Sequence, residues 1–296
     1  MVSRGGIGGA RRAEWFLKYV LAGDDIGGAR QALEAEPYLA TAKWRASAFR
    51  VAGIASFMAG NEDEEQDGTS LHLACCCGSL KVAALLLKVG SDPNVRNCSG
   101  RRPLCFAAHH GHLEVVRLLL ESAANPNSGS SLRRQPPLVS AADLDGSWSE
   151  DFALGYAELL VKHGADVNQT ARLEMSVEIA KDGKVTVSFK HTGTKETALH
   201  CAARHGQGRM VKLLISQAAD INAQGLEHGA TALHLVLSRR SSVSNCFAEL
   251  TETADIVELL VESGADTNAK DRHGQTPLDL AEKNDDMEAL AFVLIK

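Results

Sequence analysis

Aromatic residues and long apolar runs are both scarce in this chain. Phe, Trp and Tyr make up 5% of its 296 residues, although hydrophobic residues together make up 45%. This composition suits thin helices that pack through Ala, Leu and Val. No run approaches the roughly 18 apolar residues that cross a bilayer, so we expect no membrane insertion. The net charge of −6 argues against a general nucleic-acid binder, and we expect no nucleic-acid partner.

The seven cysteines are an odd number and lack the spacing of a disulfide framework. They stand at positions 75, 76, 77, 98, 105, 201 and 246. We therefore expect reduced thiols and a cytoplasmic protein, with the nucleus and the mitochondrion left open. Three arginines near the N-terminus precede an apolar stretch that Glu14 and Lys18 interrupt. This pattern favours a first helix over the alternatives, a secretion signal or a mitochondrial presequence.

A period of 33 residues organises the centre of the chain. Leu104 follows Leu71 by 33 positions, in segments of similar sequence. The same shift relates three further pairs: Gly78 and Gly111, Leu85–Leu87 and Leu118–Leu120, and Asp92–Asn94 and Asn125–Asn127. A period in this range is typical of a solenoid of stacked repeats, and a single-core globule does not show it.

Each copy carries the signals of two helices. Hydroxyls that can cap a first helix stand at Thr69, Thr197, Thr231 and Thr276, and proline fills the next slot at Pro103, Pro137 and Pro277. Glycines that can end this helix in a left-handed conformation stand at Gly78, Gly111 and Gly206. A second helix follows, with apolar residues at spacings of 3 and 4, such as Val82, Leu85 and Leu86. We expect this stripe to be buried.

These motifs resemble those of the ankyrin-repeat family. The matching segments are Thr197-Ala198-Leu199-His200, Thr231-Ala232-Leu233-His234, Thr276-Pro277-Leu278 and Gly264-Ala265-Asp266-Thr267-Asn268. The resemblance covers about residues 67–296. It implies an all-α solenoid of stacked helix-loop-helix units with β-turn fingers and no catalytic apparatus. It also implies that the first helices and the fingers line a concave groove.

The chain is predicted to have three parts. Residues 1–12 are rich in Gly and Arg and are expected to be disordered. Residues 13–66 are interpreted as a degenerate N-terminal capping repeat and a linking helix, the helix running from Thr41 to Ala59. Residues 67–296 are predicted to form the ankyrin-repeat domain, with six repeats.

Three insertions interrupt the repeats. The last Asn of successive copies stands at positions 94, 127, 168, 222 and 268, so the later steps exceed 33 residues. We place the excess between helices at 143–151 and 239–253, and in a finger at 169–196. Within 169–196, apolar and polar residues alternate on both sides of Lys181-Asp182-Gly183-Lys184. This pattern is typical of a β-hairpin, so we predict one extended hairpin that projects from the array.

The histidines and cysteines have structural explanations within the repeat. His72, His200 and His234 occupy the T-x-L-H slot, where an imidazole ties one repeat to the next. Neighbouring side chains on a helix point about 100° apart, so neither the run 75–77 nor the run 109–112 can face one metal ion. Cys76 and Cys77 occupy surface slots, where a redox-sensitive thiol is an alternative.

No motif of a known catalytic or cofactor site is present in the sequence. We find no Gly-rich phosphate loop, nucleophile elbow or recognised metal motif. The sequence therefore predicts no enzyme activity, no cofactor, no metal and no obligatory small molecule. One modification is a hypothesis: Asn168, Asn222 and Asn268 share the pattern L-x5-D-x-N, which is similar to the sites of asparaginyl hydroxylases in the family. The alternative is an unmodified turn residue.

The variable slots of the motif predict the residues that bind a partner. They are Leu73, Cys76, Cys77, Phe106, His109, His110, Ser140, Asp143, Cys201, Arg204, His205, Leu235 and Arg239. Leu73, Phe106 and Leu235 are expected to be exposed and to form a shallow apolar patch that suits a protein partner. The alternative is that these three residues pack against neighbouring helices.

Two functions from different classes are consistent with these observations. The first is a non-catalytic protein-protein interaction module, acting as an adaptor or as an accessory subunit of a larger assembly. The insertions favour it, because they add irregular contact surface. The second is a substrate-recruiting subunit of an enzyme complex such as a ubiquitin ligase or a phosphatase. That function usually needs an appended recruiting motif. None is evident outside the repeats, although residues 1–66 have room to contain one.

Overall fold

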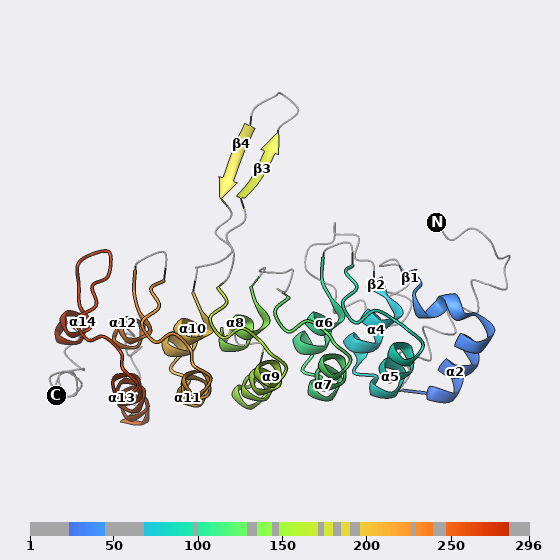
Figure 1. The fold of residues 1–296 in the computed structure, drawn as a ribbon, viewed down its shortest axis with the longest axis horizontal. Helices are drawn as coiled ribbons and strands as arrows, with labels where there is room; N and C mark the ends of the chain where they lie inside the picture. The colour runs from blue at the N-terminus through green and yellow to red at the C-terminus, as the bar shows by residue number, and fades with distance from the viewer. Residues whose placement is uncertain are drawn as a thin grey trace. The chain divides into compact units, whose positions relative to one another are not determined.

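The computed structural model describes residues 24–44, 68–97, 100–128, 135–143, 148–170, 175–179, 185–189, 196–225, 229–238 and 247–283. Most of them lie in short helices that follow one another in pairs. The chain divides into two compact units, Met1–Asn125 and Pro126–Lys296, which we call unit 1 and unit 2. Figure 1 shows their helices and strands in chain order.

In the described part of unit 1, helix α2 precedes two helix pairs. Its elements are α2 (Ile26–Ala35), η1 (Pro37–Ala40), β1 (Lys43–Trp44), β2 (Gly68–Thr69), α4 (Ser70–Cys77), α5 (Leu80–Lys88), α6 (Pro103–His109) and α7 (Leu113–Glu121). The first helices α4 and α6 pack against each other, and so do the second helices α5 and α7. Helix α2 continues the row of second helices by packing on α5. This is the stacking that the repeat period predicts.

Unit 2 repeats the same arrangement. Its elements are α8 (Pro137–Ala142), α9 (Glu150–Lys162), β3 (Met175–Ile179), β4 (Val185–Phe189), α10 (Ala198–His205), α11 (Gly208–Ser216), α12 (Ala232–Leu237), α13 (Phe247–Glu262) and α14 (Pro277–Lys283). The first helices α8, α10, α12 and α14 pack in succession, and the second helices α9, α11 and α13 do the same. Figure 1 shows these as two parallel rows within the unit.

The second helices bury the stripe that the sequence predicts. Leu86 and Leu119 of unit 1 are fully buried, as are Leu214 and Leu260 of unit 2. Each of these leucines lies at the same distance from the C-terminal end of its helix. The second helices of both units therefore pack through the same position. The prediction that stacked helical pairs share their cores is confirmed.

Left-handed residues end the helices where the sequence places glycine. Gly78 and Gly206 end first helices with φ of 70° and 71°. Two repeats have alanine where others have a left-handed glycine after the second helix: Ala123 has φ 64° and Ala218 has φ 59°. A left-handed conformation costs an L-residue about 1–2 kcal/mol, because its Cβ crowds the backbone. These two repeats therefore carry backbone strain.

Two of the three insertions lengthen the second helix of their repeat. Helices α5, α7 and α11 have 9 residues each, whereas α9 has 13 and α13 has 16. Residues 150–151 and 247–253 of the predicted insertions are therefore helix, so only part of each excess lies between the helices, in the longer segments that precede α9 and α13. At the start of α9, Trp148 contacts the rings of Phe152 and Tyr156 at centroid distances of 5.5 and 5.6 Å. This aromatic cluster anchors the first insertion to its own helix.

The insertion at 169–196 contains two paired strands. Strands β3 and β4 are antiparallel, with Met175 opposite Phe189, Val177 opposite Val187 and Ile179 opposite Val185. They lie on either side of the Asp182-Gly183 sequence at which a hairpin turn was predicted. The connecting residues lie outside the described part of the chain.

The linking helix predicted for residues 41–59 is wrong at its start. Lys43 and Trp44 form strand β1, which pairs with Gly68 and Thr69 of β2 just before the first helix of the next repeat. This pairing satisfies backbone groups that a helix would satisfy internally. Residues 45–67, the predicted disordered segment 1–12 and the end of the chain after residue 283 lie outside the described residues.

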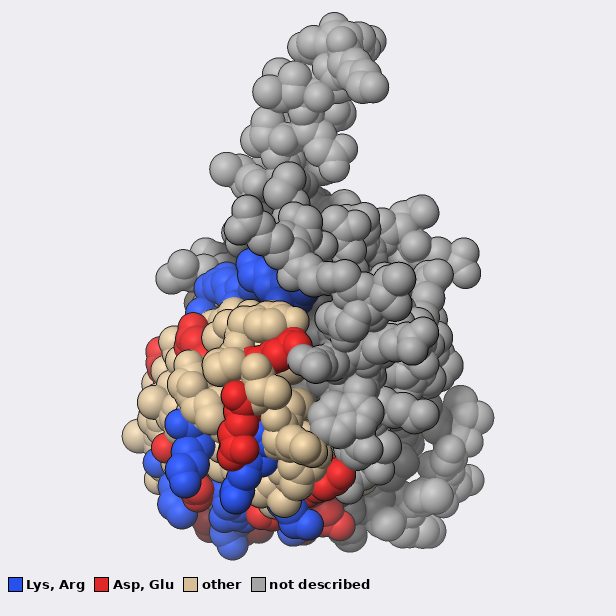
Figure 2. Space-filling model, turned by 90° about the vertical axis from the view of Figure 1, so that its right-hand side faces the viewer, with Lys and Arg blue, Asp and Glu red and all other residues tan. Residues whose placement is uncertain are grey.

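The face of unit 1 that carries α2 has charges of both signs. Figure 2 shows Lys, Arg, Asp and Glu side chains intermingled around an uncharged area. Exposed apolar residues in this unit include Ile26 and Tyr38, at 39% and 55%. A face with charges of both signs lacks the uniformly positive field that attracts the phosphates of a nucleic acid. The absence of a nucleic-acid partner stays a prediction.

We predict that Ala218→Gly stabilises the protein. Relief of the left-handed strain should exceed the added chain entropy of glycine, so the free energy of unfolding should rise by about 0.5–1 kcal/mol. Equilibrium urea unfolding measures this change. Ala219→Gly is the matched control, because the neighbouring alanine is 7% exposed and lacks a positive φ. If both variants lose stability equally, Ala218 carries no left-handed strain that glycine can relieve.

Candidate protein-interaction surface

A buried histidine connects consecutive repeats at the start of three first helices. In each case the imidazole Nδ1 accepts the backbone N–H of the capping threonine, at 3.0 Å for His72, 3.3 Å for His200 and 3.2 Å for His234. The Nε2 atom contacts a backbone carbonyl of the next repeat, at 3.1, 3.2 and 3.2 Å respectively. The prediction that these residues tie the repeats together is confirmed.

These contacts fix the tautomer of the rings. A backbone N–H only donates, so the Nδ1 atom facing it must be unprotonated and the proton must lie on Nε2. For His200, burial lowers the pKa below its usual range, although the contact with the carbonyl of Ala230 opposes this shift. A catalytic role for these histidines would need a free ring nitrogen, and both nitrogens of each ring are engaged.

The asparagines of the finger turns also link neighbouring repeats. Asn94 donates to the carbonyl of Ala123 at 2.9 Å and accepts the N–H of Asn125 at 2.8 Å. Asn222 makes the same two contacts in unit 2, with Gly264 at 3.0 Å and Asp266 at 2.8 Å. These hydrogen bonds set the spacing between fingers.

The three candidate hydroxylation residues lie on the surface. Asn168, Asn222 and Asn268 are all exposed. The side chain of Asn168 accepts the N–H of Asp220 at 2.8 Å, so it takes part in the same turn network. Their modification stays a prediction.

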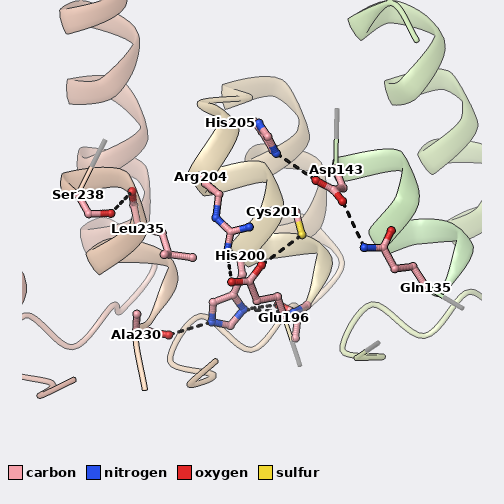
Figure 3. A network of polar contacts seen from close by, with 11 residues as sticks. Gln135, Asp143, Glu196, His200, Cys201, Arg204, His205, Ala230, Leu235 and Ser238 are labelled. Carbon is pink, nitrogen blue, oxygen red and sulfur yellow. Dashed lines mark hydrogen bonds and ion pairs between the residues drawn. The ribbon is translucent and has the colours of Figure 1, made fainter. Parts of the chain in front are cut away.

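The first helices of unit 2 carry a network of charged side chains. Glu196 precedes α10 and forms an ion pair with Arg204 of that helix. Asp143, at the end of α8, contacts the Nε2 atom of His205 at 3.2 Å and accepts the side-chain N–H of Gln135 at 3.2 Å. Figure 3 shows these two groups side by side on α10 and α8.

The network is partly exposed, and its acidic members are the more buried. The side chain of Arg204 is 39% exposed and that of Glu196 is 10% exposed. The side chains of His205 and Asp143 are 31% and 21% exposed. Each carboxylate therefore holds a more exposed nitrogen-bearing side chain in a fixed position. Leu235 of α12, on the other side of α10 in Figure 3, is half-buried.

The buried thiol of Cys201, which lies beneath this network, is protonated. Burial, followed by the charge of Asp143, raises the pKa of Cys201 to about 12. Its Sγ atom lies 3.9 Å from a carboxylate oxygen of Glu196. Cysteine, histidine and aspartate thus occur together here, but a thiolate nucleophile needs a lowered pKa. This arrangement does not supply one.

The prediction that Cys76 lies on the surface is wrong. It is 6% exposed, and its Sγ atom lies 3.2 Å from the Nε2 atom of His110 in the next repeat. Burial raises the pKa of Cys76 to about 12 and that of Cys77 to about 11, and burial also lowers the pKa of His110 to about 4. The pair is therefore a neutral thiol beside a neutral imidazole. His112 contacts the carbonyl of Cys76 at 3.1 Å, so its ring also links one repeat to the next.

The apolar patch expected from Leu73, Phe106 and Leu235 is wrong for two of its members. Leu73 is 0% exposed and Phe106 is 7% exposed. Phe106 packs edge-on against the ring of His72, with centroids 5.3 Å apart. Neighbouring first helices approach closely enough to enclose these slots, so the alternative, packing between helices, holds for both residues. Only Leu235 is half-buried.

The other predicted residues divide between surface and core. Cys201 is buried at 2% exposure, whereas His109 is exposed. The half-buried ones are Cys77, His110, Ser140, Asp143, Arg204 and His205. Arg239 lies outside the described residues. The structure thus brings Asp143, Cys201, Arg204 and His205 into one network within unit 2.

Two members of the network were missed by sequence reasoning. Glu196 and Gln135 lie in finger segments just before a first helix, outside the variable helix slots that guided the prediction. Glu196 stands eight residues before Arg204 and outside α10, so helical spacing gave no signal for this pair. Its buried carboxylate determines where the guanidinium of Arg204 is held.

Within the described residues, no group of three or more His, Cys, Asp or Glu side chains is placed to hold a metal ion. None of their helices is both long enough and apolar enough to cross a membrane.

Comparison with known proteins places the chain among repeat proteins built from helix pairs. The model of "Ankyrin repeats (3 copies)" matches residues 45–130 and 71–171, and the model of "Ankyrin repeat" matches 194–226 and 228–272. These matches cover more than half of the chain, so it belongs to the ankyrin-repeat family. The match begins at residue 45, ahead of the predicted domain start at 67.

Solved structures of low sequence identity share this fold. The ankyrin repeat domain of Bcl-3 is 20% identical, with a TM-score of 0.58 over 95% of this chain and 98% of that one. The ankyrin repeat protein EF0377 is 24% identical, with a TM-score of 0.58 over 76% of this chain and 96% of that one.

The curated relatives are longer proteins. The rice "Probable E3 ubiquitin-protein ligase XBOS33" is 30% identical over 55% of this chain and 34% of its own length. The human "Ankyrin repeat and SOCS box protein 6" is 30% identical over 67% of this chain and 38% of its own length. This chain therefore spans about a third of the length of these two relatives.

We predict that His200 makes stability sensitive to acid. Its pKa is lowered in the folded state by burial, so the unfolded chain takes up the proton first. The free energy of unfolding should therefore fall as pH falls below about 6.5, the usual pKa of histidine. Urea unfolding at a series of pH values measures the slope.

The variant His200→Gln should lose stability at neutral pH and show a shallower decline in acid than the wild type. Val211→Ala is the control, since it removes buried apolar volume from α11 without removing a titrating group. It should keep the wild-type slope. If His200→Gln shows the same dependence of unfolding free energy on pH as the wild type, His200 is not the source of the acid sensitivity.

Proposed function

We propose that the chain is a non-catalytic adaptor, or an accessory subunit of a larger assembly, that binds a protein partner through its first helices and fingers. The ankyrin-repeat family consists of protein-interaction modules. One observation supports a particular surface: two charged groups, Glu196 with Arg204 and Asp143 with His205, lie partly exposed and adjacent on unit 2.

Arg204 is suited to the centre of this surface. Its ion pair with the buried Glu196 holds the guanidinium in one place, so less side-chain entropy is lost when a partner binds. A guanidinium has five N–H donors, and one carboxylate cannot satisfy all of them. We expect the partner to offer a carboxylate or backbone carbonyl to Arg204 and an apolar side chain to Leu235. Arginine is enriched among residues that dominate binding energy.

The chemistry of the same surface supports a non-catalytic role. The thiol of Cys201 is protonated, because its pKa is about 12. His205 and Arg204 are both engaged with carboxylates. These residues are therefore arranged to present fixed polar groups, and none of them supplies an activated nucleophile.

A second candidate is a substrate-recruiting subunit of a ubiquitin ligase. The names of two relatives favour it, since one is a probable E3 ubiquitin-protein ligase and the other carries a SOCS box. The alignment covers 34% and 38% of those relatives. In this candidate the repeats would bind the substrate and another segment would recruit the ligase.

Affinity purification of the full chain from its native source tests the proposal. The variant Arg204→Gln/Leu235→Ala should recover at least about tenfold less partner, the effect of roughly 1.4 kcal/mol. The control Glu158→Gln/Lys212→Gln alters exposed residues of the second helices α9 and α11 and should bind as the wild type does. Circular dichroism should show folded helices in both variants.

Two results would count against the adaptor proposal. Equal recovery by wild type and the Arg204→Gln/Leu235→Ala variant would mean that the partner binds elsewhere. Stoichiometric recovery of ubiquitin-ligase subunits would support the second candidate instead.

A further inference from the structure

Two arginines stand on opposite arms of the finger that precedes α6 in unit 1. The backbone N–H of Asn97 donates to the carbonyl of Arg101 at 2.9 Å, and the N–H of Gly100 donates to the carbonyl of Asn97 at 3.0 Å. The side chain of Asn97 also accepts the N–H of Arg101 at 2.7 Å. This narrow turn sets Arg96 on one arm and Arg102 on the other, each one residue beyond the paired residues.

The two guanidinium groups are close enough to repel each other. Arg96 is exposed and Arg102 is half-buried. Burial, followed by the charge of Arg96, lowers the pKa of Arg102. Among the described residues, the Nη1 atom of Arg102 has no hydrogen-bond partner and neither arginine has an ion-pair partner. Like charges on opposite arms are destabilising, so an anion between them would stabilise the finger.

Arg102 also occupies a position at which three other repeats gain stability. The equivalent residues Thr69, Thr197 and Thr231 each form a capping box with the histidine three positions later. The side chain of Arg102 makes no capping contact with α6. A lost N-cap lowers the stability of a helix. Residues that break a local rule at such a cost are expected where they serve binding.

We infer that Arg96 and Arg102 form a binding site for an acidic segment of a partner protein, in which two neighbouring carboxylates each meet one guanidinium. A guanidinium can hold a carboxylate through two parallel hydrogen bonds. The pair of carboxylates would also offset the repulsion between the two arginines. The site goes beyond the proposed function, because it lies in unit 1 and shares no residue with the network of unit 2.

The charges around the finger favour carboxylates over a nucleic acid. The charge of Asp92 partly opposes the lowered pKa of Arg102, so a carboxylate of the protein itself lies nearby. A polyanion would be repelled by this group, and nucleic acids bind broad positive surfaces. Two single negative charges on a short peptide match two arginines more closely.

A finger of unit 2 provides an internal comparison. There the N–H of Asp271 donates to the carbonyl of Gln275 at 2.9 Å, as that of Asn97 does to Arg101. The residues one position beyond this pair are Lys270 and Thr276. This finger therefore carries one cation where the finger of unit 1 carries two. Paired cations are not a requirement of the finger turn.

Fluorescence anisotropy of the full chain with a labelled synthetic peptide tests the inference. The probe holds two consecutive glutamates flanked by glycines, and a second probe has glutamines in their place. The wild type should bind only the glutamate probe, and less tightly as salt rises. Arg96→Gln and Arg102→Thr should each weaken binding about tenfold, because each removes charge-assisted hydrogen bonds.

Two control variants should bind the glutamate probe as the wild type does. Lys270→Gln removes one positive charge from the corresponding finger position of unit 2. Arg204→Gln/Leu235→Ala removes the surface proposed above, so the result does not depend on that proposal. If either control weakens binding as much as Arg96→Gln does, the inference is overturned.

Arg102→Thr separates a binding role from a structural one. Threonine at this position can cap α6, so the midpoint of urea unfolding should stay the same or rise while binding falls. A fall in both would show that Arg102 is structural and would overturn the inference.

Three further results would overturn it. The first is no binding of the glutamate probe by the wild type. The second is binding of a phosphoserine probe at least tenfold tighter than that of the glutamate probe, which would favour a phosphorylated partner. The third is binding that appears only after Glu62, Asp63, Glu64 and Glu65 are changed to glutamine, because the chain would then supply its own acidic segment.

Discussion

The structure depends on a buried imidazole that is shared between two repeats. In His200 one ring nitrogen accepts the N–H that starts its own helix, and the other donates to the carbonyl of Ala230 in the next repeat. A buried polar group without a partner costs roughly 1–3 kcal/mol, so each repeat needs its neighbour to satisfy this ring. His72 and His234 impose the same requirement at their own repeats. Stacking is thereby specified by polar contacts as well as by apolar burial.

This constraint decides which residues remain for function. The slots between neighbouring first helices are enclosed, so Leu73 and Phe106 belong to the core. Among the first helices of unit 2, α10 keeps accessible polar side chains, where Glu196 fixes Arg204 and Asp143 fixes His205. The surface is therefore preorganised by the scaffold. Without Glu196, Arg204 would stay on α10, but its guanidinium would no longer be held in one position.

Much of the fold was predictable, because the repeat period determines it. The 33-residue shift located the buried Leu86 and Leu119, and the T-x-L-H slot located the bridging histidines. The exposure of variable slots was less predictable, since burial depends on how closely successive helices approach. Phe106 fits a surface slot by position and is enclosed in three dimensions. Glu196 was missed because its role depends on a contact with Arg204 across a helix start, which periodicity does not encode.

Hydrogen exchange of the wild type and His200→Ala tests the shared imidazole most directly. The amides of α10 and of the next first helix, α12, should lose protection together, because the lost ring served both repeats. Protection of α14, two repeats away from α10, should fall less. Loss confined to α10, with α12 as protected as in the wild type, would contradict the dependence of one repeat on the next.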